Sequence, residues 1–223
     1  MLSTGLILAK DHPDGWRIAG TGAVFNRRHT YVTAAHCVPD GADVAIVPAV
    51  APEHSKVLQA QTVVRHPESD YAVVTLDEAQ VADAPGLALY VAPTGGLIDG
   101  GDFVGHGYPV EGAENPVART FKGHFMRYFG YEPPGGGPGY FAAEMSIPAP
   151  PGFSGGPLAY AARPGELIAV VTTNVDSEII LDRFEEVERD GSRHAERVTR
   201  VISYGIAAMV DREWLIEQAP PSE

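Results

Sequence analysis

The sequence predicts an all-β fold. Its 25 glycines and 19 prolines are spread along the whole chain, which suits many short strands joined by turns better than a helical bundle. Short runs rich in β-branched and aromatic residues alternate with these turn residues. With 223 residues and 44% hydrophobic content, the chain is long enough to bury a sizeable core. We therefore expect residues 1–223 to form a single domain.

The first half of the chain predicts one β unit, at about residues 15–90. Its expected strands lie at residues 21–26, 30–35, 43–47, 57–64 and 71–76. The polar run Arg27-Arg28-His29 separates the first two strands, a pattern typical of a hairpin. Residues 82–101 are rich in glycine and proline, so they predict a connection with at most one short strand.

A second β unit is predicted at about residues 100–210. Its expected strands lie at residues 103–107, 118–127, 140–144, 157–160, 167–174 and 198–208. The run Glu-Pro-Pro-Gly-Gly-Gly-Pro-Gly at 132–139 predicts a surface loop. Residues 176–197 carry both charge signs, which fits a long hairpin extension or a short surface helix.

The chain is expected to close with a helix at about residues 211–218. Asp211 is a suitable N-cap, and Trp214 and Leu215 can form the apolar face of the helix.

Composition excludes several classes of partner. The net charge is −13 and the 16 lysines and arginines form no basic run, so we expect no nucleic acid to bind. Cys37 is the only cysteine, and the first residues lack the pattern of a secretion signal or a membrane span. We therefore expect a cytoplasmic location with no membrane partner. The histidines are scattered and no metal-binding motif occurs, so no metal or other cofactor is expected.

A glycine-rich segment around Ser154 carries the sharpest chemical signal. It reads Gly-Phe-Ser-Gly-Gly-Pro at residues 152–157. A nucleophilic serine needs its hydroxyl exposed on a tight turn whose backbone N–H groups converge on the developing oxyanion, and glycine permits such a turn. A Gly-Ser loop without chemistry is the alternative for this segment alone.

Two further residues have the chemistry to activate such a serine. His36 follows a β run of small residues, where an imidazole can face a cleft and shuttle protons near neutral pH. Asp70 precedes a strand and can orient the imidazole. Taken singly, the histidine could be structural and the aspartate a turn cap. The three fragments together, in the order His, Asp, Ser, predict a catalytic triad.

These fragments resemble the signature blocks of chymotrypsin/trypsin-like serine peptidases. The matching segments are Thr-Ala-Ala-His-Cys-Val at 33–38, Ser-Asp-Tyr-Ala-Val-Val at 69–74 and Gly-Phe-Ser-Gly-Gly-Pro-Leu at 152–158. The resemblance extends to residues 20–25 and 105–109, and covers most of residues 18–210. It implies two perpendicular six-stranded antiparallel β-barrels, followed by the C-terminal helix, with the active-site cleft between the barrels.

The resemblance also implies a role for each site residue. His36 would act as general base and acid, Asp70 would fix its tautomer, and the backbone amides of Gly152 and Ser154 would form the oxyanion hole. The substrate would be a protein or peptide, cleaved through an acyl-enzyme on Ser154. An activating or restraining protein partner is also expected, because an intracellular protease has to be held in check.

Departures from the family pattern indicate which branches of the family the sequence resembles more closely. Phe153 stands where digestive members carry an aspartate that pairs with a newly cleaved N-terminus, and no Ile-Val-Gly-Gly start is present. We therefore expect no activation by that route. The closer likeness is to disulfide-free bacterial branches, the HtrA-type and glutamyl-endopeptidase-like enzymes, and Cys37 is expected to be unpaired.

The primary pocket, which receives the side chain before the cleaved bond, is expected to be neutral. Its predicted lining is Pro148, Ala149, Thr172, Thr173, Asn174 and Tyr204. No acidic residue stands at its predicted floor, which favours a small or apolar side chain over arginine or lysine. Residues 176–197 fall between the two wall strands and are expected either to overhang the cleft and restrict access, or to be an ordinary surface insertion.

Other functions fit the sequence less well. A catalytically silent barrel protein that binds a partner is the main alternative, and the intact triad argues against it. Metal-dependent hydrolases and nucleotide-binding enzymes lack their motifs here. An α/β-hydrolase would share the Gly-x-Ser-x-Gly pattern, but its triad order is Ser, acid, His, and only His194 follows Ser154.

Overall fold

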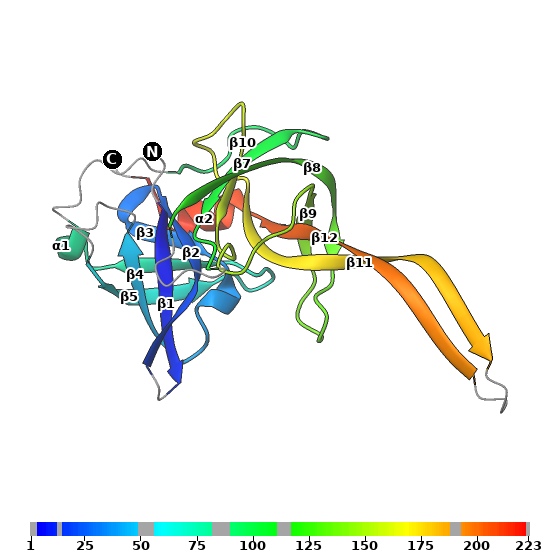
Figure 1. Ribbon diagram of the computed structural model, residues 1–223. Helices are drawn as coiled ribbons and strands as arrows, with labels where there is room; N and C mark the ends of the chain where they lie inside the picture. The colour runs from blue at the N-terminus through cyan, green and yellow to red at the C-terminus, as the bar shows by residue number, and fades with distance from the viewer. Residues whose placement is uncertain are drawn as a thin grey trace.

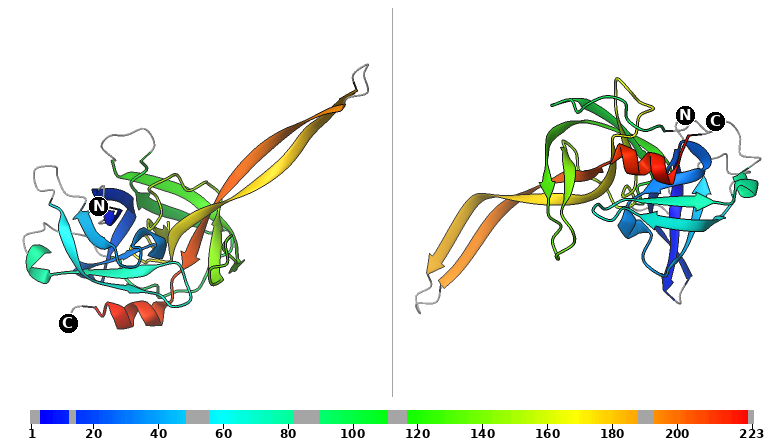
Figure 2. Two further views of the ribbon diagram at one scale, coloured as in Figure 1. Left: turned by 90° about the horizontal axis from the view of Figure 1, so that it is seen from below. Right: turned by 180° about the vertical axis from the view of Figure 1, so that it is seen from behind.

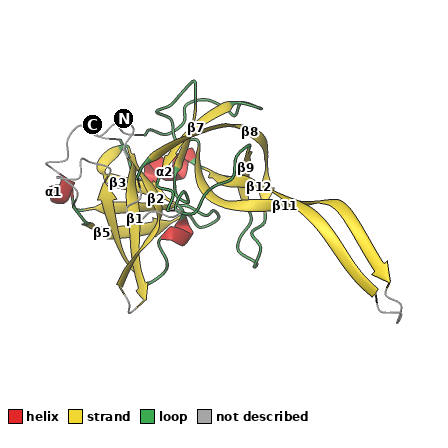
Figure 3. Cartoon of the chain, in the orientation of Figure 1, coloured by secondary structure: helices red, strands yellow, loops and turns green. Residues whose placement is uncertain are grey.

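The computed structural model describes residues 4–12, 15–48, 56–81, 90–110, 117–187 and 193–221. Twelve β-strands form two closed six-stranded antiparallel barrels, in agreement with the predicted fold class (Figures 1 and 3). Within the described part of the chain, no helix is long and apolar enough to cross a membrane. No group of side chains there has the composition of a metal site.

The first barrel has the strand order β1-β2-β3-β6-β5-β4 and closes through the pairing of β4 with β1. Its strands are β1 (Thr4–His12), β2 (Gly15–Phe25), β3 (Arg27–Thr33), β4 (Asp43–Pro48), β5 (Leu58–Arg65) and β6 (Ala72–Leu76). Inward-facing apolar side chains fill it, because residues that alternate along each strand point to one face.

Two details of the first barrel correct the sequence prediction. The barrel begins at Thr4 rather than near residue 15, because the short apolar run at the N-terminus is a strand that pairs with both β2 and β4. The turn between β2 and β3 lies at Asn26, with Phe25 opposite Arg27, instead of at residues 27–29. Asn26 has a φ of 52°, and asparagine tolerates this left-handed conformation better than most residues.

The second barrel has the strand order β10-β11-β12-β9-β8-β7 and closes through the pairing of β10 with β7. Its strands are β7 (Asp102–Gly107), β8 (Arg119–Tyr131), β9 (Tyr140–Met145), β10 (Pro157–Tyr160), β11 (Ala169–Val187) and β12 (Arg193–Met209). β11 and β12 continue past the barrel as a two-stranded ribbon, which is the hairpin extension predicted as one of two alternatives for residues 176–197 (Figure 2).

Short elements complete the fold and join the barrels. They are a 3-10 turn, η1 (Ala35–Cys37), and two helices, α1 (Glu78–Val81) and α2 (Arg212–Gln218). Tyr90, in the connection between the barrels, forms a bridge to Phe25, and Val91 forms one to Glu166. The rest of that predicted connection, residues 82–89, lies outside the described residues.

Helix α2 has the predicted cap and packing. The Asp211 side chain accepts hydrogen bonds from the N–H groups of Glu213 and Trp214, at 2.8 and 3.1 Å. Leu215 is fully buried, and Trp214 packs edge-on against Tyr71 of the first barrel. The C-terminal helix is therefore anchored beside the segment that follows Asp70.

Candidate active site

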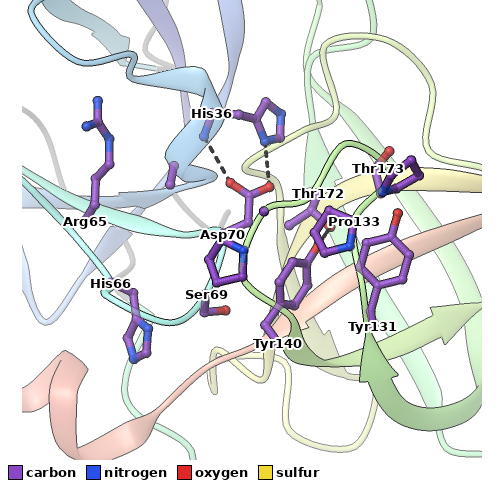
Figure 4. A pocket seen from close by; sticks show the side chains of 14 residues that line it. His36, Arg65, His66, Ser69, Asp70, Tyr131, Pro133, Tyr140, Thr172 and Thr173 are labelled. Atoms are coloured by element: carbon purple, nitrogen blue, oxygen red, sulfur yellow. Dashed lines mark hydrogen bonds and ion pairs between the residues drawn. The ribbon is translucent and has the colours of Figure 1, made fainter.

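His36 and Asp70 meet at one end of the first barrel. β3 and β6 are neighbours, with Thr33 opposite Ala72, so the residues after β3 lie beside those before β6. The His36 Nδ1 atom is 2.7 Å from Asp70 Oδ2, and the His36 backbone N–H donates to Asp70 Oδ1 at 3.0 Å (Figure 4). These two contacts fix the ring and leave Nε2 free of hydrogen bonds to the described residues.

The surroundings of His36 change its proton affinity. Burial opposes protonation of the ring, but the hydrogen bond to Asp70 and the neighbouring Cys37 outweigh it and raise the pKa of His36 from 6.5 to about 10. The side chain is 46% exposed, so solvent screens part of this effect. Cys37 itself is buried and forms no disulfide, as expected.

Ser154 lies in a tight turn that is held by both barrels. Gly152 and Gly155 have φ values of 86° and 82°, a region that side chains other than glycine rarely adopt. The backbone N–H of Thr21 in β2 donates to the Ser154 carbonyl at 2.7 Å, and the Gly155 N–H donates to Val171 O of β11 at 2.7 Å. The turn is therefore fixed between a strand of each barrel.

Close packing around this turn shows why positions 152, 155 and 156 need glycine. A β-carbon at Gly155 would overlap the carbonyl oxygen of Thr21, and one at Gly152 would overlap that of Tyr108. A β-carbon at Gly156 would lie 2.6 Å from the Phe153 ring. Gly155 and Gly156 thus make room for a neighbouring strand and for Phe153.

The backbone around Gly152 leaves two N–H groups free. The Pro151 carbonyl accepts a hydrogen bond from Val110 N at 3.0 Å, and in a trans peptide the N–H of the next residue, Gly152, points the opposite way. Neither the Gly152 N–H nor the Ser154 N–H has a hydrogen-bond acceptor among the described residues. Two unpaired donors in one turn have the chemistry of an anion-binding site.

The Ser154 hydroxyl does not contact the imidazole. It donates to the carbonyl oxygen of Thr172 at 3.2 Å, and no hydrogen bond joins it to His36 within the described structure. The two residues nonetheless lie in the same region, because a β-carbon at Gly20 would be 2.5 Å from Ser154 O and 2.6 Å from Cys37 Sγ. The structure thus joins His36 to Asp70 and brings Ser154 near them with its hydroxyl turned to a backbone carbonyl.

Phe153 occupies an apolar site inside the second barrel. It is fully buried and stacks on Phe121, with ring centroids 4.2 Å apart at an angle of 26°. A β-carbon at Gly105 or Gly156 would approach the same ring within 3.1 Å. The residue that replaces the aspartate of digestive family members is therefore a core residue, and it offers no partner for a charged N-terminus.

A pocket of about 520 Å³ adjoins the His36–Asp70 pair. Its lining includes Tyr131, Tyr140 and Thr172, together with prolines of the 132–139 segment (Figure 4). The Tyr140 hydroxyl lies 3.0 Å from Thr172 Oγ1, which donates to Ile206 O at 3.1 Å. The sequence analysis missed Tyr131, Tyr140 and the loop, because nothing in their local pattern indicates which surface the loop covers.

The predicted walls of the primary pocket are in direct contact. Asn174 Oδ1 accepts a hydrogen bond from Ala149 N at 2.7 Å, and Asn174 Nδ2 donates to Ala149 O at 2.8 Å. Gly205, opposite Asn174 across β11 and β12, donates to Ile147 O at 2.9 Å. Of the other predicted lining residues, Pro148 is exposed, Ala149 and Thr172 are buried, and Thr173 and Tyr204 are half-buried. The side chain of Asn174 therefore bridges the two sides.

Comparisons with known proteins agree with this architecture. The family model described as a trypsin-like peptidase domain matches residues 20–170. No curated protein sequence matches the chain. Similar solved structures include the active form of the Rv3671c protease from M. tuberculosis, with a TM-score of 0.65 and 18% identity over 100% of this chain and 82% of the other.

Two other solved structures are similar to a comparable degree. The thermostable serine protease AL20 from an extremophilic microorganism has a TM-score of 0.60 and 17% identity over 92% of this chain and 90% of the other. The MamO protease domain from Magnetospirillum magneticum has a TM-score of 0.59 and 14% identity over 97% and 95%.

The two-barrel fold and the serine turn between the barrels define a protein of the chymotrypsin-like class. Because the family model spans more than half of the chain, this protein belongs to the trypsin-like peptidase family. The comparisons do not identify a particular branch within it.

Proposed function

We propose that this protein is a serine endopeptidase with His36, Asp70 and Ser154 as its catalytic triad. The doubly hydrogen-bonded His36–Asp70 pair carries the proposal, because it fixes a general base at the junction where the turn of Ser154 meets the first barrel. A surface histidine that merely paired with a carboxylate would not need its backbone N–H bound to the same group.

The reaction follows from these positions. Ser154 Oγ attacks the scissile carbonyl carbon while His36 Nε2 takes the hydroxyl proton, and the N–H groups of Gly152 and Ser154 stabilise the negative oxygen. The C–N bond then breaks as His36 returns the proton to the leaving amine. Water hydrolyses the acyl-enzyme by the same route, with His36 again acting as base and then as acid.

The bridge between Asn174 and Ala149 supports a narrow substrate choice. The two hydrogen bonds occupy the polar groups of both walls and fill space that a large side chain would need. No charged residue is among the predicted lining residues. We therefore expect cleavage after small uncharged residues.

A second candidate function has one observation in its favour. The Ser154 hydroxyl donates to Thr172 O rather than facing His36, as in a resting site that awaits a partner or in a silent protein-binding module. Activity would require the Ser154 side chain to turn from Thr172 O toward His36, while the N–H groups of Gly152 and Ser154 have no acceptor among the described residues.

Covalent labelling with a fluorophosphonate distinguishes the two. The probe captures an activated serine without knowledge of the substrate. We expect the wild type to be labelled and Ser154→Ala and His36→Ala not to be, with Ser177→Ala, at an exposed serine of β11 outside the pocket, as a matched control that remains labelled. If the wild type stays unlabelled, the resting or silent alternative is favoured. A cytoplasmic location and a restraining partner remain proposals for separate tests, such as cell fractionation and co-purification.

A further inference from the structure

The ribbon formed by residues 176–187 of β11 and 193–203 of β12 has two free edges. β10 pairs with β11 only at Ala169 and Val170, and β9 pairs with β12 only at residues 206–208. From Asp176 opposite Ser203 to Val187 opposite Arg193, the two strands pair only with each other among the described strands. The ribbon projects away from both barrels in all views, so the expectation that it overhangs the cleft is wrong (Figures 1 and 2).

The middle of the ribbon exposes apolar side chains. The members of this group are between 41% and 61% exposed, and they are Ile179, Ile180, Leu181, Val198 and Val201. The pairing register shifts between Ile180 and Asp182, so Leu181 lies at a bulge, where the ladder is interrupted. Ile180 and Val201 lie on one face of the ribbon and Ile179 on the other, because strand residues alternate. A two-stranded ribbon alone is only marginally stable in water, and an added strand could cover apolar side chains on both faces.

One edge of the ribbon is continuous with the proposed active site. Val171 of β11 exchanges backbone hydrogen bonds with Gly155 and Gly156, so this edge of β11 faces the serine turn. The next residue, Thr172, accepts the Ser154 hydroxyl and lines the pocket beside His36. An extended chain with its scissile bond at Ser154 that lies along β11 would therefore continue onto the ribbon.

We infer that the free β11 edge of the ribbon, from Asp176 to Val187, binds the far flank of an extended polypeptide substrate as an added strand, beyond the residues next to Ser154. Backbone hydrogen bonds to the edge would provide affinity, and Ile179, Ile180 and Leu181 would contact apolar side chains of the substrate. The strand from Asp176 to Val187 is about 35 Å long, so the preferred substrates are unstructured segments rather than short peptides. This inference rests on the proposed function, because it takes Ser154 as the point of cleavage.

Charge patterning along the ribbon agrees with a polypeptide occupant. Glu178 forms an ion pair with Arg197 at 3.3 Å, and Asp176 and Arg200 are also exposed. Charges of both signs beside the apolar group discourage edge-to-edge pairing between identical ribbons, as charged residues on edge strands commonly do. A second copy of this chain is therefore treated as an outcome of the test.

The test separates ribbon binding from catalysis. Residues 177–202 are replaced by Asn-Gly, a two-residue turn that suits the opposed pair Asp176 and Ser203. A second variant, Ile179→Lys with Leu181→Lys, keeps the full chain in case the shortened ribbon impairs folding. Val57→Lys is the matched control, because Val57 is 56% exposed and lies away from the ribbon.

Two measurements are made on each variant. Binding of fluorescein-labelled β-casein, an unstructured polypeptide, is followed by anisotropy in the Ser154→Ala background, and fluorophosphonate labelling is followed with Ser154 intact. We expect both ribbon variants to bind casein at least tenfold more weakly, the control to bind normally, and labelling rates to stay within twofold of the wild type.

The inference is overturned by casein binding that does not depend on the ribbon or cannot be detected. It is also overturned if sedimentation shows a wild-type dimer that the ribbon variants convert to a monomer, since the ribbon would then join two copies. Absence of labelling in the wild-type protein would, by itself, count against the proposed function. The casein measurement would still decide the role of the ribbon.

Discussion

At the scale of single residues, the proposed chemistry depends on the protonation state of His36. The hydrogen bond to Asp70 favours the imidazolium, so the pKa of His36 is raised above its ordinary value of 6.5 despite the opposing effect of burial. Only the neutral ring can accept the proton of Ser154. The hydrogen bond that orients His36 therefore also moves the pH range in which its ring can act as a base to higher pH.

The pH dependence of the reaction tests this directly. Below the raised pKa the ring is protonated and inactive, so the labelling rate should rise with pH and have its midpoint above 6.5. Asp70→Asn removes the stabilising charge, so the midpoint should move down while the rate falls by about 10⁴-fold. Fluorophosphonate labelling rates between pH 5 and 10 provide the measurement. A wild-type midpoint at or below 6.5 would contradict the assignment.

We propose that the side chain of Asn174 limits the size of the predicted primary pocket. Asn174→Ala removes both hydrogen bonds to Ala149 and opens space between the walls. Cleavage after Leu or Phe should increase by about tenfold relative to cleavage after Ala, within the range that a methylene or two contributes to discrimination. Cleavage profiling of a peptide library by mass spectrometry measures this ratio.

Gln59→Ala is the control for the Asn174 experiment. Gln59 carries the same kind of amide side chain but is exposed on β5 of the first barrel, outside the predicted primary pocket. Its profile should match that of the wild type. An unchanged profile for Asn174→Ala would show that the bridge does not limit the side chain before the cleaved bond.

At the scale of elements, local pattern predicted strands well where apolar and turn residues alternate clearly. The expected strands at 43–47, 103–107 and 157–160 agree with β4, β7 and β10 to within one residue at each end. The strand β1 was missed although the turn residues Asp-His-Pro-Asp-Gly follow it at 11–15, because its short apolar run does not alternate and its pairing with β4 is a long-range contact. The ribbon was one of two predicted alternatives, since mixed charge alone does not distinguish a hairpin from a surface helix.

The residues of the candidate site also fall into two groups, those that short motifs predict and those that they do not. His36, Asp70, Gly152 and Ser154 were identified from the residue types that the chemistry needs, within short motifs. The Asn174–Ala149 bridge and the contribution of the 132–139 loop to the pocket depend on contacts between segments far apart in the chain. No local sequence pattern encodes such contacts.

The serine turn also makes a prediction at the scale of an element. Gly155 and Gly135 both have positive φ values, 82° and 106°, but only Gly155 faces another backbone, whereas nothing lies within 4 Å of a β-carbon at Gly135. Gly135→Ala should cost about 1–3 kcal/mol of unfolding free energy from backbone strain. Gly155→Ala should cost about 1–3 kcal/mol more, because the added methyl overlaps Thr21 O.

Urea unfolding of the two glycine variants gives the comparison. The difference between them isolates the packing of the turn against β2, since the conformational strain is of the same kind in both. Equal destabilisation of the two variants would mean that the turn adjusts freely, and the rigid positioning of Ser154 would then need another source.

At the scale of the whole molecule, the site depends on how the two barrels are joined. Thr21 of the first barrel is the centre of this junction: its hydroxyl donates to Gly152 O at 2.8 Å and accepts from Tyr108 N at 3.0 Å, and its backbone N–H donates to Ser154 O. His36 and Asp70 belong to the same barrel as Thr21. Thr21 is therefore one of the contacts that place the base and the nucleophile relative to each other.

Thr21→Val tests whether that junction positions the nucleophile. Valine has the same shape but leaves Gly152 O and Tyr108 N without their partner, which should cost about 1–3 kcal/mol of unfolding free energy for each buried group. The turn should also loosen, and small displacements of reacting groups slow catalysis strongly. We expect kcat to fall by about tenfold or more with a smaller change in KM.

A purely structural role would give a different pattern. Thr30→Val, at a buried threonine of β3 that pairs with β6, removes a hydroxyl of the same barrel away from the serine turn and should leave kcat unchanged. Thr21→Ser keeps the hydroxyl and should restore most of the lost rate even if its stability remains low. If kcat follows stability equally in all three variants, Thr21 only supports the fold, and the barrels position His36 and Ser154 by other contacts.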